Sequence, residues 1–455
     1  MHKRVTEFLE SNTSLHEEQY GFRSSRSCEH ALLTAQSTLV NNMSKRQVSL
    51  LLLIDFSKAF DMVEYPILLK KLYRYGIRGN ALEWFRSYLN NREQFVSVNG
   101  ADSPKYRMDY GVPQGSILGP LLFIIYINDL PNIYKLAKFI LYADDANIIL
   151  TGDSIHEIEQ KLLELIPLLV NWVGCNGLKL NLKKTNYMIF SRSRVETTRN
   201  IFIGTTLIKR VHETKFLGVI LDDRLNWSHH IKAVKAKMNR YVGIMYRIKN
   251  LLPLKSRIQI FHSFVQSYIN YCSLIWGFAS KSNIDSLFVG QKKGLRAAIP
   301  GYVNYFYKDG VIPSHTKQSF NDLNILTVHN VIATNALTFM HKVYNFPGSL
   351  PPSVKATIAC DAPKQGNDHE DCKDWLDKYS DCCFNKTVFY KGPLIYCDSK
   401  YSHLISPATL LSFKVYRRRT KTFLLQTQSD GTGEEWQASN FAINQISGLR
   451  KSKRT

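Results

Sequence analysis

Three aspartates stand where the sequence predicts that strands end. Asp55 follows the apolar run 48–54, and Asp144 and Asp145 separate two shorter apolar segments. Carboxylates fixed at the ends of neighbouring strands can lie side by side, and carboxylates with substrate phosphates are the ligands that Mg²⁺ prefers. Two such ions stabilise the attacking and leaving oxygens of an in-line phosphoryl displacement. The alternative interpretation is that all three are ordinary turn residues in contact with solvent.

A loop rich in glycine and proline lies between these acids in the chain. Its sequence is GVPQGSILGP, residues 111–120, and it leads into the apolar segment Leu121–Tyr126. Gly115 carries no side chain, so the backbone there can approach a ligand closely. Gln114 can both donate and accept hydrogen bonds to a base or a sugar. Taken alone, Pro-Gln-Gly is equally consistent with a plain turn.

Apolar periodicity predicts the elements that would position these residues. Residues 48–56 predict a buried strand, and residues 65–75 predict a helix. Asn80 is predicted to cap a second helix. Residues 94–98 predict a strand that ends at an Asn-Gly turn, and the apolar segments around Asp144-Asp145 predict a hairpin with acids at its tip.

Further along, Ser154 and Glu157 form a capping-box pattern before a helix with one apolar face, which Pro167 is predicted to bend. Short strands are predicted at 187–190, 201–203 and 216–221.

The charge of the chain points to a polyanionic partner. The 455 residues include 59 Lys and Arg against 37 Asp and Glu, a net charge of +22. Residues 229–300 look mainly helical and contain twelve basic residues against the single acid Asp285. Such a surplus is typical of proteins that bind nucleic acid. The alternative is a basic protein that is merely soluble. The aromatic residues of this region could stack on bases, although at helical spacing they are more often core.

Composition also excludes some classes of protein. The N-terminus lacks the apolar stretch of a signal peptide, and no apolar run reaches the ~20 residues that span a bilayer, so no membrane is predicted as a partner. The eight cysteines contain no CxxC pair, which argues against a zinc ribbon. A metal site formed by His369, Cys372, Cys382 and Cys383, within the cluster from Cys360 to Cys397, is considered and not favoured.

The ordered motifs resemble the palm of reverse transcriptases. Asp55 lies in DFSKAFD, Gln114 in GVPQGSILGPLLF and Asp144 in YADD, and the similarity continues in GLKLNLKKTNYMIF (177–190) and KFLGVIL (215–221). Upstream, QYGFR (19–23) looks like the segment between fingers and palm. The whole set is similar to the polymerase of jockey-like non-LTR retrotransposons, and residues 225–276 look like the thumb of those elements.

The resemblance implies an α+β fold, a right-hand polymerase with partial fingers, an antiparallel-sheet palm and a helical thumb. The Asp144-Asp145 hairpin is expected at the centre of the sheet. The expected domains are fingers and palm over 1–228, a basic thumb over 229–300, and a C-terminal extension of unknown role over 301–455. Because only residues 1–18 precede Gln19, the chain is expected to be N-terminally truncated.

The resemblance also implies roles for the acids. Asp55 and Asp144 would bind two catalytic Mg²⁺ ions, with Mn²⁺ as a possible substitute, and the carbonyl of Phe56 would be a further ligand. Asp145 would shape the site. Lys184 would protonate the leaving pyrophosphate; a solvated lysine at 184, or Lys183 in that role, stays open.

Five further residues would contact the substrates. Phe60 would lie under the sugar and reject a 2′-hydroxyl, the alternative being a core residue. Gln114 and Gly115 would touch the incoming nucleotide and template, and Tyr142 would support the primer end. Arg23 would contact the triphosphate.

The implied function is an RNA-directed DNA polymerase that transfers nucleotides from dNTPs to a primer 3′-OH. Its partners would be template RNA, which includes the RNA of the element, and a DNA primer; no protein partner is predicted. The life cycle of the family implies action in the nucleus, with the cytoplasm as the alternative. A second hypothesis is a catalytically inactive remnant that only binds nucleic acid. An intron-type maturase is the third and is disfavoured by the segment 215–231.

Overall fold

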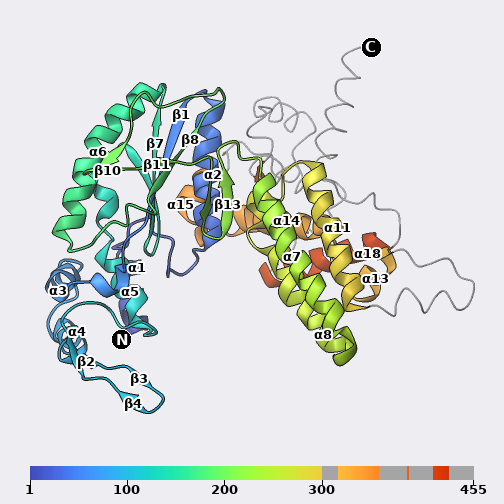
Figure 1. Cartoon of the computed structure of the whole chain (residues 1–455), viewed down its shortest axis with the longest axis horizontal. Helices are drawn as coiled ribbons and strands as arrows, with labels where there is room; N and C mark the ends of the chain where they lie inside the picture. The colour runs from blue at the N-terminus through green and yellow to red at the C-terminus, as the bar shows by residue number, and fades with distance from the viewer. Residues whose placement is uncertain (300–315, 358–386, 389–412, 430–455) are drawn as a thin grey trace, which may run out of the picture. The chain divides into compact units, whose positions relative to one another are not determined.

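A computed structural model gives the architecture of the chain (Figure 1). It describes residues 1–299, 316–357, 387–388 and 413–429. The chain divides into two compact units, Met1–His212 and Glu213–Thr455, which are described separately. Strands and helices occur together in both, and the α+β class is confirmed.

The first unit contains a five-stranded sheet with helices against it. Its helices are α1 (His2–Ser11), α2 (Cys28–Ser44), η1 (Ala59–Met62), α3 (Tyr65–Arg74), α4 (Asn80–Leu89), α5 (Leu118–Tyr126), η2 (Leu130–Ile133) and α6 (Ile155–Cys175). Its strands are β1 (Val48–Ile54), β2 (Arg92–Gln94), β3 (Ser97–Val98), β4 (Ala101–Asp102), β5 (Tyr106–Met108), β6 (Ala137–Tyr142), β7 (Asp145–Gly152), β8 (Asn186–Phe190), β9 (Phe202–Ile203), β10 (Thr206–Leu207) and β11 (Lys209–Arg210).

Strand β1 is the centre of the sheet, whose order is β11-β8-β1-β7-β6. It pairs antiparallel with β7 on one side and with β8 on the other, and only β11 runs parallel to its neighbour β8. The expectation that the Asp144-Asp145 hairpin occupies the centre is wrong. The run of apolar residues in β1 takes the central place because every one of its residues is buried.

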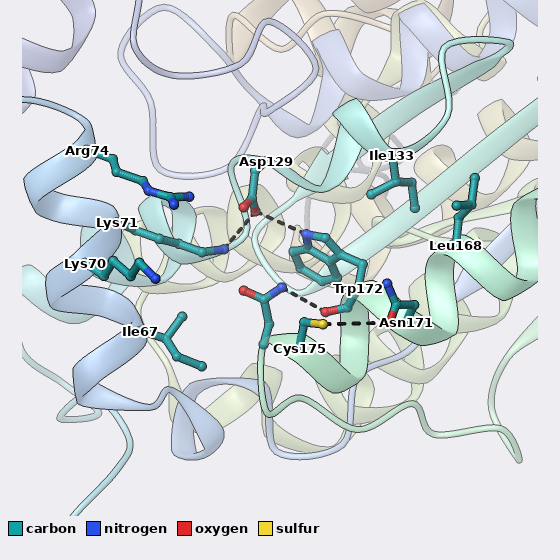
Figure 2. A pocket seen from close by; sticks show the side chains of 11 residues that line it. Ile67, Lys70, Lys71, Arg74, Asp129, Ile133, Leu168, Asn171, Trp172 and Cys175 are labelled. Carbon is teal, nitrogen blue, oxygen red and sulfur yellow. Dashed lines mark hydrogen bonds and ion pairs between the residues drawn. The ribbon is translucent and has the colours of Figure 1, made fainter.

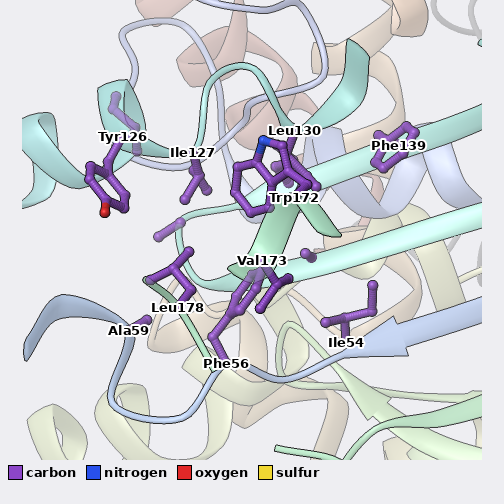
Figure 3. Close-up of a cluster of buried hydrophobic side chains, with 14 of the residues drawn as sticks. Ile54, Phe56, Ala59, Tyr126, Ile127, Leu130, Phe139, Trp172, Val173 and Leu178 are labelled. Carbon is purple, nitrogen blue, oxygen red and sulfur yellow. The ribbon is translucent and has the colours of Figure 1, made fainter. Parts of the chain in front are cut away.

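Both faces of β1 are covered (Figure 1). Leu50, Leu52 and Ile54 belong to the core cluster that contains the buried residues of α5 and α6, part of which is drawn in Figure 3. Side chains alternate along a strand, so Ser49 points to the opposite face, where its hydroxyl accepts a hydrogen bond of 2.9 Å from Asn42 of α2. Packing on both faces holds the sheet in place, and the sheet in turn positions the loops at the ends of its strands.

Two local predictions for this unit need correction. Asn80 is the first residue of α4 rather than its cap; Gly79 is the N-cap and makes no side-chain bond. The strand predicted at 94–98 is divided between β2 and β3. The predicted turn is confirmed, with positive φ at Asn99 and Gly100. Ser154 caps α6 as predicted, since its Oγ accepts from the Glu157 N–H at 3.3 Å, whereas the Glu157 carboxylate accepts from the Asp153 N–H at 2.9 Å rather than from that of Ser154.

The second unit is mainly helical. Its two strands are β12 (Glu213–Phe216) and β13 (Val219–Asp222). Its helices are α7 (Ser228–Ile248), η3 (Lys249–Leu251), α8 (Leu254–Phe261), the π-helical turn η4 (His262–Gln266), α9 (Ser267–Asn270), α10 (Ser273–Trp276), α11 (Lys281–Ala298), α13 (Thr316–Asp322), α14 (Val328–Asn345), η5 (Pro347–Ser349), α15 (Pro352–Thr357) and α18 (Phe413–Ser429).

The single strand predicted at 216–221 is a hairpin turn instead. Leu217 and Gly218 both have positive φ, and the chain reverses there between β12 and β13. The glycine inside the apolar run was the available signal. Among the described helices, none is both long and apolar enough to cross a bilayer.

Candidate active site

The carboxylates of the predicted site lie at one end of β1 and β7. The register of these antiparallel strands ends with Ile54 opposite Ala146. Continuing it by one residue on each strand places Asp55 opposite Asp145. Because successive residues of paired strands stay in register, two acids far apart in sequence become neighbours at the same edge of the sheet.

Asp144 reaches this edge through a tight turn. Tyr142 pairs with Asp145, so Ala143 and Asp144 form a two-residue connection between β6 and β7. Ala143 has a φ of +53°, the one positive value in the turn, as in the type II′ turns that suit the twist of a hairpin. The predicted hairpin with acids at its tip is confirmed.

Two of the three acids, Asp144 and Asp145, have a raised pKa. Burial raises the pKa of Asp145, and the charges of Asp144 and Asp55 raise it further. Burial also raises the pKa of Asp144, and the charge of Asp55 adds to this effect. Asp144 and Asp145 are nevertheless exposed at the hairpin tip. The site therefore concentrates negative charge at a place that a cation or its ligands can reach.

This charge predicts a pH-dependent cost in stability. Carboxyls with a raised pKa hold their protons more tightly in the folded state, so stability decreases as pH rises above the unfolded value of about 3.9. Asp145→Asn is expected to raise the urea midpoint at pH 7 and to change it little at pH 3.5, where the carboxyls carry protons. An equal change at both pH values would contradict the proposed repulsion.

The carboxylates of this site fit Mg²⁺, provided that water and substrate complete the coordination shell of the ion. Carboxylate oxygen is the chemistry that Mg²⁺ prefers, and a bound cation would relieve the rise in the pKa of Asp144 and Asp145. Within the described ranges, no group of three or more His, Cys, Asp or Glu side chains is arranged to hold a metal ion by itself. Mg²⁺ commonly takes one or two carboxylates and completes its shell with water and substrate phosphates.

The segment before β8 fixes the end of β1. The Asn181 N–H donates to the Asp55 carbonyl, and the Ser57 N–H donates to the Lys179 carbonyl, both at 2.8 Å. These two bonds flank the bridge between Phe56 and Leu180, which leaves the Phe56 carbonyl outside it. Lys184 Nζ lies 3.8 Å from Asp55 Oδ2 with 71% of its side chain exposed. Lys184 is thus brought to the acids.

Two of the residues predicted to contact the nucleotide, Phe60 and Gln114, lie in segments that hydrogen bonds connect. Gln114 Nε2 donates to Asp61 Oδ1 at 2.9 Å, and the Val112 N–H donates to the Phe60 carbonyl at 2.9 Å. Phe60 is half-buried and stacks on Phe123 with ring centroids 4.5 Å apart. Its alternative interpretation as a core residue therefore stays open.

Gly115 and Tyr142 are placed where their predicted contacts require access. Gly115 is exposed, has a φ of +84°, and has no neighbour within 4 Å of the position that a Cβ would take. Tyr142 is half-buried and ends β6, directly before the turn that carries Asp144. The roles of both remain predictions.

Arg23 is engaged elsewhere. Its guanidinium donates to both carboxylate oxygens of Glu10, at 2.9 and 2.6 Å, and to the His16 carbonyl at 2.7 Å. Only 6% of its side chain is exposed. These contacts join α1 to the loop that follows it, so the structure gives Arg23 a positioning role and does not bring it to the acids.

Two residues outside the predicted set hold the hairpin tip. The buried Gln19 Oε1 accepts from the Gly21 N–H at 2.8 Å and from the Ala143 N–H at 3.2 Å. A Cβ on Gly21 would lie 2.5 Å from the Ala143 nitrogen. Both residues belong to the QYGFR motif, but their contacts join segments distant in sequence, so the motif alone could not reveal them.

In the basic region 229–300, helix α7 buries one stripe of apolar residues and exposes several of its cations. Along α7, Ile231, Val234, Met238 and Tyr241 are buried, whereas Lys232, Lys237, Arg240 and Arg247 are exposed. Among the aromatics, Phe261 and Trp276 are also buried, while Tyr246 is exposed. The core interpretation therefore holds for Tyr241, Phe261 and Trp276. The cysteine cluster from Cys360 to Cys397, with His369, lies outside the described residues.

A pocket of about 520 Å³ in the first unit is lined by none of the predicted site residues (Figure 2). Lys71 ion-pairs there with Asp129 at 2.8 Å, and the Trp172 indole N–H donates to the same carboxylate at 3.2 Å. Burial lowers the pKa of Lys71, and Asp129 opposes that effect. These contacts tie α3 to α6.

The first part of the chain matches a known protein family. Residues 1–221 match the family described as reverse transcriptase (RNA-dependent DNA polymerase). That match contains Asp55, Gln114 and the Asp144-Asp145 pair.

The chain is similar to polymerases from mobile elements. The chain is 28% identical to the probable RNA-directed DNA polymerase from transposon BS of Drosophila melanogaster, over 65% of this chain and 34% of that protein. It is 25% identical to the RNA-directed DNA polymerase from mobile element jockey of Drosophila funebris, over 73% and 36%. The chain thus spans about a third of the length of these relatives. Among solved structures, telomerase from Candida albicans aligns with a TM-score of 0.40 at 12% identity, over 68% of this chain and 57% of that one.

Proposed function

We propose that this chain, whose residues 1–221 are a reverse transcriptase domain distantly similar to the RNA-directed DNA polymerases of jockey-like non-LTR retrotransposons, extends a DNA primer along an RNA template. The observation that carries the proposal is the meeting of Asp55 with Asp144 and Asp145 at one edge of a buried sheet. The raised pKa values of Asp144 and Asp145, to which the charge of Asp55 contributes, support it.

The acids would act as ligands and the loops as positioning elements. Asp55 and Asp144, with the Phe56 carbonyl, would hold two Mg²⁺ ions, and Asp145 would keep the hairpin tip negative. Bound Mg²⁺ would neutralise the charge that develops on the transferred phosphoryl group. Lys184, whose Nζ lies 3.8 Å from Asp55 Oδ2, would donate a proton to the leaving pyrophosphate.

The nucleotide would meet the loop system of Phe60 and Gln114. The bond from Gln114 to Asp61 holds the amide in place, and the open space at Gly115 admits a base or a sugar edge. Tyr142 would support the primer end. Such catalysis rests on positioning and charge neutralisation and requires no covalent intermediate.

The exposed cations of α7 would contact the duplex backbone. Lys232, Lys237, Arg240 and Arg247 project from the helix whose opposite side is buried. Contacts of this kind read no sequence and weaken steeply with salt. We also propose the RNA of the element as template and the nucleus as the site of action, because the relatives belong to mobile elements.

Primer extension tests the proposal. Purified chain with poly(rA)–oligo(dT), dTTP and Mg²⁺ is expected to lengthen the primer, and chelation of the metal is expected to stop the reaction reversibly. The competing function is a remnant that only binds nucleic acid. Absence of extension, with the template-primer still bound, would reject the polymerase and favour the remnant.

A further inference from the structure

Helix α18 (Phe413–Ser429) is a basic helix in the second unit. Its charged residues are Lys414, Arg417, Arg418, Arg419 and Lys421, and none is acidic. Arg417 and Lys421 stand one turn apart as like charges, an arrangement that destabilises a helix unless something offsets it. The helix therefore needs either a strong attachment to the protein or an anionic ligand.

The attachment is provided by α14. Tyr416 is buried and its ring stacks on His341 with centroids 3.9 Å apart and an angle of 3° between the planes. Thr420 and Leu424 follow at one-turn intervals and are also buried. The Leu424 carbonyl accepts from Asn330 Nδ2 at 3.4 Å. One stripe of α18 is thus fixed against the protein.

The docked stripe determines where the cations point. Arg417, Arg418, Arg419 and Lys421 are all exposed. At 3.6 residues per turn, Arg417 and Arg418 lie within roughly 60° of Lys421 around the helix axis, whereas Arg419 lies about 160° away. Three cations therefore share one face beside the docked stripe, and Arg419 stands apart.

The charge of Lys421 acts on a residue of η4. His262, the first residue of η4, has its pKa lowered by burial and then by the charge of Lys421. Because His262 and Lys421 are both basic, this interaction does not neutralise the charge of the face.

We propose that Arg417, Arg418 and Lys421 form a contact for the phosphodiester backbone of nucleic acid, additional to the exposed cations of α7. Arginine offers bidentate hydrogen bonds to phosphate, and backbone contacts by Arg and Lys position a protein on nucleic acid without reading sequence. The inference rests on the proposed function in one respect, because a polymerase must handle such a polyanion.

An anionic membrane is the less suitable partner for the same charge. Amphipathic helices bind membranes by burying an apolar face among the lipids. The apolar stripe of α18, with Tyr416 and Leu424, is already packed inside the protein. Among the described side chains of α18, Val415 is the one exposed apolar residue, which offers a membrane little apolar surface.

The test is the salt dependence of binding by the full chain, without Mg²⁺ or dNTPs. Single changes Arg417→Gln, Arg418→Gln and Lys421→Gln are each expected to reduce the slope of log K against log salt by about 0.7–0.9. Arg419→Gln is the matched control in the same helix and is expected to leave the slope unchanged. The triple variant should bind roughly 10- to 100-fold more weakly in 0.1 M salt.

Two probes separate the sources of phosphate. A 30-nucleotide single-stranded RNA and a duplex DNA of the same length are titrated in parallel, and a loss confined to one identifies the ligand. Slopes equal to wild type with both probes would overturn the inference, as would a loss seen only with phosphatidylserine vesicles. Unchanged thermal unfolding of the variants confirms that α18 remains docked. The binding test measures no DNA synthesis. Its result therefore does not depend on whether the chain extends a primer.

Discussion

Replacing Asp144 with Asn is expected to abolish primer extension while leaving nucleic-acid binding intact. The change removes one carboxylate from the group at the end of β1 and β7 and keeps the size of the side chain. Loss of a single group that stabilises charge in a transition state costs about 10²–10³-fold, and a metal ligand should exceed that range. Single-turnover extension on poly(rA)–oligo(dT) measures the effect.

The control for this variant is Asp102→Asn. Asp102 is an exposed acid in strand β4 of the same unit, so it matches the chemistry and exposure but lies outside the site. It should extend primers as the wild type does. Extension by Asp144→Asn within about tenfold of wild type would remove Asp144 from the site, because tenfold corresponds to only about 1.4 kcal/mol.

The second large effect is expected from Gly21→Ala. A methyl group at this position would lie 2.5 Å from the Ala143 nitrogen and 3.1 Å from the Tyr142 carbonyl carbon, both backbone atoms. The hairpin that carries Asp144 must then move. Overpacking of this kind costs about 1–3 kcal/mol, and a displacement near 1 Å lowers catalysis by about 10²-fold. Urea unfolding and single-turnover extension measure the two consequences.

Gly174→Ala provides the comparison. Gly174 lies within α6, and no atom lies within 4 Å of the place that a Cβ would occupy there. Alanine at this position should stabilise the helix by about 0.5–1 kcal/mol and leave extension unchanged. If Gly21→Ala folds normally and extends primers at the wild-type rate, the close approach does not position the hairpin.

Sequence patterns predicted this fold best where periodicity or a motif is local. The apolar run before Asp55 became the central strand, and the helix predicted at 65–75 is α3. The acidic hairpin was found because its two strands are adjacent in the chain. In each case the signal and the structure occupy the same short segment.

The rest depends on contacts between distant segments. The order of the sheet places β1 between β7 and β8, and no local pattern specifies that. Gln19 acquires its role only when it meets Ala143. An arginine can bind a triphosphate or form an ion pair with an acid. Arg23 pairs with Glu10 because the packing of α1 brings that carboxylate to it. A residue type defines possible chemistry, whereas the fold selects the partner.

The central position of β1 has a consequence for synthesis on the ribosome. The strand is made before both of its partners, because β7 and β8 come much later in the chain. At about 5–20 residues per second, roughly 5–20 s pass before β7 is translated. During that interval Ser49–Ile54, an uncharged apolar hexamer, lacks its partners and has the composition of an aggregation-prone segment. We therefore expect the nascent chain to depend on chaperones until the sheet closes.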